Sequence, residues 1–258
     1  MAVDDPRFGG IARLYGREAL ARLQASHVAV VGIGGVGSWA AEALARTGLG
    51  RITLIDMDDI CVTNTNRQLP AMKGNIGRLK VEVMAERLQA INPGCEVRSI
   101  MGFVTPDTLA DYIPDDIDCV VDCIDSVASK VALIAWCRRR KIGIVTTGGA
   151  GGQVDPTMIK VADLSKTVND PLAAKARSLL RRDHNFPRAE SKRSFGVPCV
   201  YPTEQLRYPK PDGSVCQQKS FVGEGVKLDC SGGFGSVTMV TATFGMVAAA
   251  RTVERLLR

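Results

Sequence analysis

The amino-acid sequence predicts an α/β fold, a doubly wound and mostly parallel, Rossmann-like sheet with helices on both faces and an elaborated C-terminal half. Three observations carry this prediction. Strand-like and helix-like patterns alternate over the first two thirds of the chain, a glycine-rich turn joins the first strand to the first long helix, and two later strands end in a carboxylate. Alternating strands and helices are typical of parallel sheets, which bind ligands beyond the carboxyl ends of their strands.

Residues 28–56 read as strand, glycine turn, helix and strand. The apolar run VAVVG is typical of a strand buried on both faces, and helical periodicity begins at SWAAEALART. The turn between them contains Gly32, Gly34, Gly35 and Gly37, and the second strand ends at Asp56. Such glycines allow a tight turn, a close phosphate and close helix packing, while the acid can accept hydrogen bonds from a ribose. We therefore predict a nucleotide site here.

The following elements continue the alternation. Lys80 lies in the first turn of a predicted amphipathic helix, and Ser126 is the predicted N-cap of a later one. The predicted strand DCVVDCID ends at Asp125, which is expected to face the same crevice as Asp56. The predicted elements are an entry helix within 1–27, a helix at 77–93, a strand at 96–102, a helix at 105–113, strands at 118–125 and 143–149 around a helix at 126–141, and a strand at 158–163.

The C-terminal half follows a different pattern. We predict a helix at 170–182, a mobile polar connection at 183–199, a strand at 203–211 and a glycine-rich loop at 212–235. A closing helix is predicted at 236–257 with Ser236 as its N-cap. The whole chain is predicted to be one domain, with a nucleotide-binding core at 1–168, a mobile substrate-side segment at 169–235 and the closing helix at 236–258.

Composition narrows the class of protein. The chain has 258 residues, is 45% hydrophobic and carries a net charge of +6, which permits a polyanionic partner. Two aspartates stand near the N-terminus where a signal peptide would be basic and then apolar, and no apolar run is long enough to span a bilayer. We expect a cytoplasmic protein without a membrane segment. The eight cysteines contain no C-x-x-C pair, so free thiols are expected rather than a zinc site.

The loop after Asp56 points to a particular chemistry. It places Asp58, Asn64 and Arg67 where a dinucleotide-binding dehydrogenase needs nothing comparable. Together with Lys80 and the DCID motif, this loop resembles the ubiquitin-activating-enzyme-like adenylyltransferases, the family of ThiF and MoeB. The resemblance implies that ATP binds at the glycine turn, with catalytic roles for Arg67, Lys80 and Asp125. The implied ATP-binding residues are Gly32, Gly34, Gly35, Gly37, Asp56, Asp58, Asn64, Arg67, Lys80, Asp125 and, from a partner subunit, Arg13.

The implied roles agree with the charges involved. Joining a carboxylate to the α-phosphate of ATP brings two anions together, so Arg67 and Lys80 would cover the developing charge. The resemblance also implies that Asp125 holds Mg²⁺ against the departing pyrophosphate. Members of the family contribute an N-terminal arginine across a twofold interface, for which Arg7 and Arg13 are candidates and Arg13 is preferred. A homodimer is therefore expected.

Further motifs, among them RFGGIARLYG, DPLAAKAR and SGGFGSVTMVTATFG, are similar to a branch of the family that modifies tRNA. That resemblance implies adenylation of the threonyl carboxylate of threonylcarbamoyladenosine next to the anticodon, followed by ring closure with loss of AMP. An adenylyltransferase for a ubiquitin-like sulfur carrier is the alternative, against which the missing C-x-x-C pairs count. An NAD-dependent oxidoreductase is a third. A sulfur-transfer protein is a candidate partner, and Cys230 is the candidate thiol for such transfer.

A basic stretch is the predicted contact for the anticodon stem-loop of tRNA. Residues 175–193 carry seven basic side chains against two acidic ones. Arg181, Arg182 and Arg188 are predicted to bind tRNA phosphates, and Phe186 to stack on an unpaired base. The alternative is a solvated charge run without a ligand.

Overall fold

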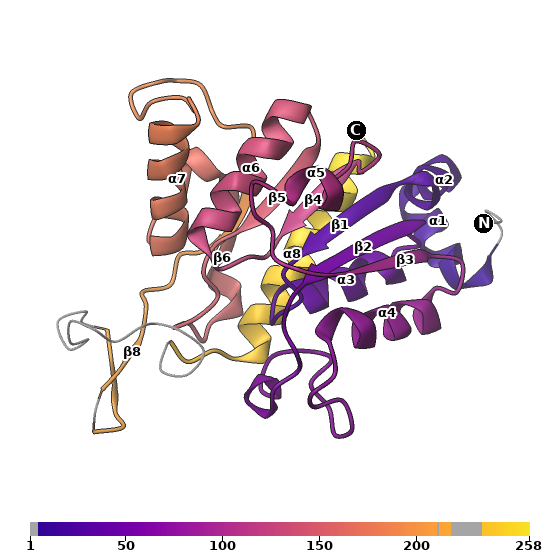
Figure 1. Ribbon diagram of the computed structural model, residues 1–258, viewed down its shortest axis with the longest axis horizontal. Coiled ribbons are helices and arrows are strands. Elements are labelled where there is room, and N and C mark those ends of the chain that lie inside the picture. The colour runs from indigo at the N-terminus through magenta and orange to yellow at the C-terminus, as the bar shows by residue number, and fades with distance from the viewer. Residues whose placement is uncertain (1–4, 211, 218–233) are drawn as a thin grey trace.

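The computed structural model describes residues 5–210, 212–217 and 234–258. Its centre is a seven-stranded sheet in the order β3-β2-β1-β4-β5-β7-β6, in which β6 alone runs antiparallel to its neighbour (Figure 1). The strands are β1 His27–Val31, β2 Arg51–Asp56, β3 Glu96–Met101, β4 Cys119–Asp122, β5 Gly143–Thr147, β6 Ile159–Asp163 and β7 Pro198–Pro202. The predicted α/β fold class is confirmed.

Helices cover both faces of this sheet. Alternate residues of β1 point to opposite faces, so Val28 and Val30 pack with α3, α4 and α8, whereas Ala29 and Val31 pack in the core formed by α5, α6 and α7. The helices are α1 Gly9–Tyr15, α2 Arg17–Ala25, α3 Gly37–Arg46, α4 Lys80–Ile91, α5 Leu109–Tyr112, α6 Val127–Arg140, α7 Pro171–Asp183 and α8 Thr238–Leu256. In the described part of the chain, no helix combines the length and the apolar character needed to cross a membrane.

Helix α8 (yellow in Figure 1) lies against α3, β4 and β5, although the sequence separates it widely from all three. A Cβ on Gly245 would come within 2.5 Å of the Val36 carbonyl oxygen, so glycine is required for this close packing. The predicted N-cap of α8 is wrong. Val237 occupies the N-cap position without a side-chain hydrogen bond, and the Ser236 carbonyl instead accepts from the Asn66 side chain.

The predictions for residues 183–199 and 203–211 are wrong in part, because a strand, β7, begins within the first range and little of the second is a strand. The sequence assigned the start of β7 to a polar connection, yet Cys199, Val200 and Tyr201 are buried between β5 and β6. The prolines of this run begin and end the strand, where a missing N–H costs least. Of the described residues of the predicted later strand, 203–210, only β8 Tyr208–Pro209 forms a strand, paired with β9 Val215–Cys216.

Three further elements differ from prediction. Strand β4 ends at Asp122, whose side chain is buried, and Asp125 follows three residues later in a loop. Ser126 occupies the N-cap position of α6 but donates and accepts no capping hydrogen bond. The predicted entry helix is divided into α1 and α2 at Gly16, whose φ of 95° interrupts the helix.

Candidate active site

A cavity of about 600 Å³ lies at the carboxyl ends of β1, β2, β4 and β5. Its walls come from the glycine turn after β1, the loops after β2 and β4, the turn after β5 and the start of α8. Most of the predicted site residues line it together: Gly32, Gly34, Gly35, Asp56, Asp58, Arg67, Lys80 and Asp125. The parallel sheet therefore brings residues from distant parts of the sequence into one site.

The glycines of the turn have different structural roles. Gly32 has a φ of 88°, and a Cβ there would lie 2.9 Å from the Cys123 carbonyl oxygen. Gly37 does not line the cavity; its Cβ would overlap the Gly32 carbonyl oxygen, so it brings α3 against the turn. Gly34 has only the Gln68 amide near its missing Cβ, at 3.8 Å, which leaves its backbone accessible from the cavity. This backbone is suited to the close approach of a phosphate.

Asp56 is held at the tip of β2 by two backbone donors. Its Oδ2 accepts from the Ile33 N–H at 2.5 Å, and its Oδ1 accepts from the Asp58 N–H at 2.8 Å. Burial raises the pKa of Asp56, although Lys80 and the two N–H groups act in the opposite direction. The carboxylate is thus fixed between the glycine turn and the following loop, where it can accept from ligand hydroxyls.

The two predicted cations are in different environments. The buried Lys80 Nζ lies 2.7 Å from Asp58 Oδ2, so its charge is neutralised by a carboxylate. Arg67 donates to the Thr63 carbonyl oxygen at 3.0 Å and to Asn66 Oδ1 at 2.9 Å, both uncharged. Within the described residues Arg67 has no carboxylate partner. It therefore brings an uncompensated positive charge to the cavity.

Asn64 is not brought to the cavity wall. It is buried, and its Oδ1 accepts from the Cys61 N–H at 2.9 Å within the short 3-10 turn Val62–Asn64. The neighbouring Asn66 lines the cavity instead. The loop sequence predicted an amide here but could not tell which of the two faces the ligand.

A buried polar cluster, which the sequence analysis missed, supports the loop that carries Asp125. Asp122 Oδ2 accepts from Lys130 Nζ at 2.7 Å and from Thr146 Oγ1 at 2.6 Å, and both charged side chains are at most 1% exposed. Asp122 Oδ1 also accepts from the Ile124 N–H. The exposed Asp125 carboxylate has no hydrogen bond or ion pair with any described residue. The spacing D-x-x-D-x-x-x-x-K was the available signal.

Arg13 does not line the cavity of its own chain. It is exposed on α1, and the helices before β1 pack at the opposite edge of the sheet, where Phe8 and Leu20 approach Gly48. The alternative, Arg7, pairs with Asp5 at 2.7 Å. A role for either arginine in a partner's site stays a prediction.

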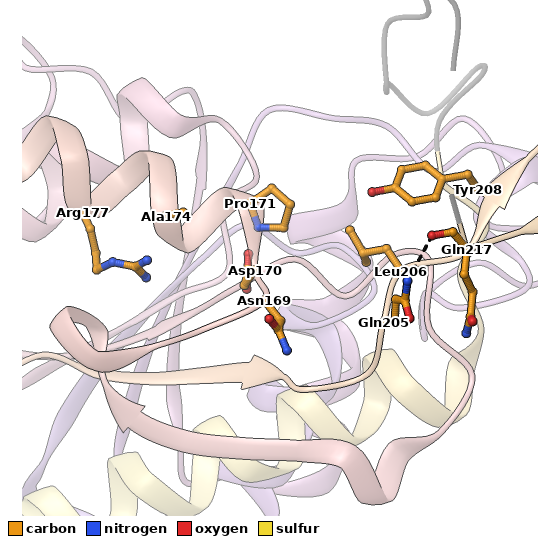
Figure 2. A pocket seen from close by; sticks show the side chains of 9 residues that line it. All are labelled: Asn169, Asp170, Pro171, Ala174, Arg177, Gln205, Leu206, Tyr208 and Gln217. Carbon is orange, nitrogen blue, oxygen red and sulfur yellow. Dashed lines mark hydrogen bonds between the residues drawn. The ribbon is translucent and has the colours of Figure 1, made fainter. Parts of the chain in front are cut away.

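A second cavity, of about 660 Å³, lies beside the first, and Figure 2 shows the residues that line it. Asp170 lies between the two cavities, because its Oδ2 accepts from the Gly149 N–H at 3.0 Å and Gly149 lines the first cavity. We call the second cavity the amide pocket, since three of its lining residues carry primary amides. Its lining residues are Asn169, Asp170, Pro171, Ala174, Arg177, Gln205, Leu206, Tyr208 and Gln217.

A third concavity, which we call the basic groove, lies next to the predicted tRNA-binding stretch, but Arg181, Arg182 and Arg188 do not line it. It runs between the end of α6 and residues 183–195 and is lined by Ala135, Arg138, Arg139, Asp183, His184, Asn185, Phe186, Pro187, Lys192, Arg193, Ser194 and Phe195. Arg181 is partly engaged, since it donates to the Pro187 carbonyl oxygen and stacks over Phe195.

Two other residues of this stretch are engaged in internal contacts. Arg182 pairs with Asp183 at 2.7 Å, and Phe186 packs edge-to-face on Phe195. Phe186 is therefore part of the local packing and not a free ring for base stacking. Arg188 is exposed.

The thiols of Cys61, Cys95, Cys119, Cys123, Cys137 and Cys199 are free. Burial raises the pKa of Cys123, which lines the first cavity, to about 12, so the thiol is protonated at neutral pH. Cys230, the candidate for sulfur transfer, lies outside the described residues.

Residues 10–258 match the model of the ThiF family, and the chain belongs to this family. It is 57% identical to the tRNA threonylcarbamoyladenosine dehydratase of Escherichia coli K12, over 97% of this chain and 93% of that protein. The enzyme of the same name from Haemophilus influenzae is 53% identical over 98% and 94% of the two chains. The crystal structure of the E. coli dehydratase in complex with ATP superposes with a TM-score of 0.87 at 53% identity, covering 99% of this chain and 97% of that one.

Proposed function

We propose that this chain is an ATP-dependent tRNA threonylcarbamoyladenosine dehydratase. The observation that carries the proposal is the convergence of the glycine turn, Asp56, Arg67, Lys80 and Asp125 on one cavity. Full-length similarity to enzymes of that name, one of them solved with ATP, supports the same reaction.

In the first step, a threonyl carboxylate oxygen attacks the α-phosphorus of ATP and pyrophosphate leaves. The Gly34 backbone approaches the phosphates, and the Asp56 carboxylate accepts from a ribose hydroxyl. Arg67 is available for phosphate at once because it has no carboxylate partner. Lys80 must exchange its contact with Asp58 for one with phosphate. The two cations then offset the charge that develops on the transferring group.

Asp125 fits a magnesium ion as a lone carboxylate. Mg²⁺ in nucleotide sites is commonly held by one or two carboxylates together with substrate phosphates and water. Asp125 is exposed to the cavity and engages no other described residue, so its oxygens are available. Bound there, Mg²⁺ would neutralise charge on the departing pyrophosphate.

In the second step, the carbamoyl nitrogen of the same nucleoside attacks the acyl carbon, its proton is lost and AMP leaves. The reacting groups belong to one side chain, which gives them a high effective molarity without a protein nucleophile. The protonated Cys123 thiol is not needed. The two steps together remove one water from the nucleoside.

The tRNA phosphates would contact the basic groove. Arg138, Arg139, Lys192 and Arg193 line it, and Arg188 lies on the adjacent segment. This assignment extends the predicted set of Arg181, Arg182 and Arg188 to the end of α6. Arg181 and Arg182 are the less available members, because their guanidinium groups already have partners.

Three further expectations belong to this proposal. The active unit would be a homodimer in which Arg13 of one subunit reaches the ATP of the other. Action on tRNA implies a cytoplasmic location. A sulfur-transfer protein remains a candidate partner, although the proposed reaction does not require one.

The decisive experiment incubates the pure protein with ATP, Mg²⁺ and tRNA that carries threonylcarbamoyladenosine. Mass spectrometry of the digested nucleosides should show loss of one water, with AMP formed in equal amount. Formation of AMP only when a ubiquitin-like sulfur carrier is supplied, with the nucleoside unchanged, would favour the alternative function instead.

A further inference from the structure

The amide pocket has the composition of a site for a neutral, hydrogen-bonding ligand. Arg177 and Asp170 are the charged residues among those lining it, so their formal charges cancel. A pyrophosphate or other polyanion would not be favoured there. Figure 2 shows Asn169 and Asp170 between Arg177 on one side and Tyr208 with Gln217 on the other.

Two amides of this pocket are available to a ligand. The Asn169 and Gln217 side chains have no hydrogen bond with any described residue, whereas Gln205 Nε2 donates to the Gln217 carbonyl oxygen at 3.2 Å. Asn169 adopts a φ of 58°, a left-handed conformation that asparagine tolerates better than most residues. Each free amide offers both a donor and an acceptor, the pairing that matches the edge of a nucleobase.

The pocket also offers apolar surface for the flat face of a ring. Pro171, Ala174 and Leu206 line it, together with Tyr208, whose ring packs on Phe234 with centroids 5.3 Å apart. Tyr208 is only 9% exposed, so its ring is held in place. Proteins bind unpaired RNA bases by this combination of ring contact and edge hydrogen bonds.

Neighbouring side chains line the amide pocket on one side and the first cavity on the other. A Cβ on Gly148 would overlap Asp170 Oδ2, and Leu172 lines the first cavity while its neighbour Pro171 lines the pocket. Phe234 likewise lines the first cavity and supports Tyr208. A ligand in the pocket is therefore adjacent to the reacting nucleoside.

We infer that the amide pocket binds an unpaired RNA base that neighbours the modified adenosine in the anticodon loop. This inference rests on the proposed function, because it requires an RNA substrate with its reacting group in the first cavity. The pocket would then select the sequence or the open conformation of the loop, separately from the phosphate contacts of the basic groove.

The test uses an anticodon stem-loop RNA that carries threonylcarbamoyladenosine, in intact form and with an abasic site at each unpaired neighbour in turn. The protein variant is Asn169→Gly with Gln217→Ala. Glycine accepts the φ of position 169, so the backbone is not strained. Gln89→Ala, an exposed amide on α4, is the matched control.

We expect the double variant to raise KM for the intact RNA roughly 10- to 100-fold, the usual cost of lost base contacts. The Kd for ATP and the melting temperature should stay unchanged. One abasic position should impair the wild type by a similar factor but cause the variant no further loss. Gln217→Ala alone should give a smaller effect of the same kind, which keeps the test valid if the double variant is unstable.

Equal KM values for wild type and variants on intact RNA would overturn the inference, as would equal losses on every abasic RNA. Absence of cyclisation by the wild type on intact tRNA and stem-loop would instead refute the proposed function, so the two failures can be told apart.

Discussion

The charged side chains of the cavity differ in whether they are free to contact a nucleotide or are already paired. Lys80 is already paired with Asp58, whereas Arg67 and Asp125 have no oppositely charged partner in the described chain. In the proposed mechanism, phosphate binding at Lys80 would compete with a carboxylate, and binding at Arg67 would not. Asp58 compensates the charge of the buried lysine.

The alternation of strands and helices predicted that Asp56 and Asp125 face one cavity, whereas Arg67 and Lys80 were predicted from the resemblance of the loop and of the following helix start to the family. The same reasoning failed for Asn64. Its direction is set by the single 3-10 turn Val62–Asn64, whose geometry follows from local hydrogen bonds and not from any periodicity. The buried Lys130 was also missed, since a lysine in a helix reads as solvated until its partner in a neighbouring strand is known.

Asp125→Asn should reduce cyclisation at least about a hundredfold, because it removes the carboxylate charge facing the phosphates. The melting temperature should change little, since an exposed side chain without partners contributes about 0.5 kcal/mol or less to stability. Turnover with modified tRNA and thermal unfolding measure the two effects. Asp107→Asn, also exposed, is the control. Near-normal activity of Asp125→Asn would contradict the assignment.

Glu42 provides a pH-dependent test of stability. Burial alone would raise the pKa of Glu42, but Arg87 and Arg46, each at 2.7 Å, together hold it below its ordinary value of 4.5. The ionised carboxylate therefore stabilises the fold above that value, and this contribution is lost as the pH falls through the lower, folded-state pKa. Glu42→Gln should lower the unfolding free energy by about 1–2 kcal/mol at pH 7.

The difference between Glu42→Gln and wild type should shrink as the pH falls below 4.5, because the wild-type carboxyl group is then protonated as well. Urea denaturation between pH 3 and pH 7 measures it. A difference that stays constant with pH would show that the ion pairs do not stabilise the fold.

Among the elements, the strands of the large sheet other than β7 were predicted from the sequence, including β3 and β6, which are only partly buried. Strands β1, β4 and β5 are buried at every position, and the ladder is parallel from β3 through β7. Strand β7 was missed because it is short and directly follows a polar stretch, to which its first two residues were assigned. Its place next to β5 depends on tertiary packing that no local pattern encodes.

Lys130→Met should destabilise the protein by about 3–5 kcal/mol, because it leaves the Asp122 carboxylate buried without its cation. Combining Lys130→Met with Asp122→Leu should recover part of that loss, since no uncompensated charge then remains. Chemical denaturation of both variants checks this. If the single and double variants were equally unstable, side-chain size and packing would matter more than charge at the Asp122–Lys130 pair.

At the scale of the whole molecule, the basic groove and the active-site cavity stand at opposite ends of α7. Leu172 at its start lines the cavity, while Asp183 at its end lines the groove. The 13 residues of the helix span about 20 Å at 1.5 Å per residue. An RNA whose modified base enters the cavity can thus place more distant phosphates on the groove. The sequence predicted only the part of the basic groove that lies within residues 175–193, because Arg138 and Arg139 come from the distant helix α6.

Arg138→Gln with Arg139→Gln should weaken tRNA binding and flatten its salt dependence. Each lost phosphate contact should reduce the slope of log K against log salt by roughly 0.7–0.9. ATP affinity should be unaffected. The control is Arg251→Gln with Arg258→Gln, which removes the same charge from the end of α8 and the residues after it, where both arginines pair with Glu254. Equal slopes for the two double variants would place the RNA elsewhere.

The packing of α8 against α3 bears on how the protein is made. Gly245 packs directly against α3, the helix that follows the glycine turn, and Thr241 lies against Gly35. Helix α8, residues 238–256, therefore completes a site that begins with β1 at residue 27. During synthesis the ribosome must reach the residues of α8 before this face of the sheet can be fully covered. Until then only α3 and α4 cover the face, and the apolar surface that α8 would bury favours aggregation of nascent chains. The emerging protein is thus expected to be a client of chaperones, and a ribosome stalled before α8 would carry a chain unable to hold its nucleotide.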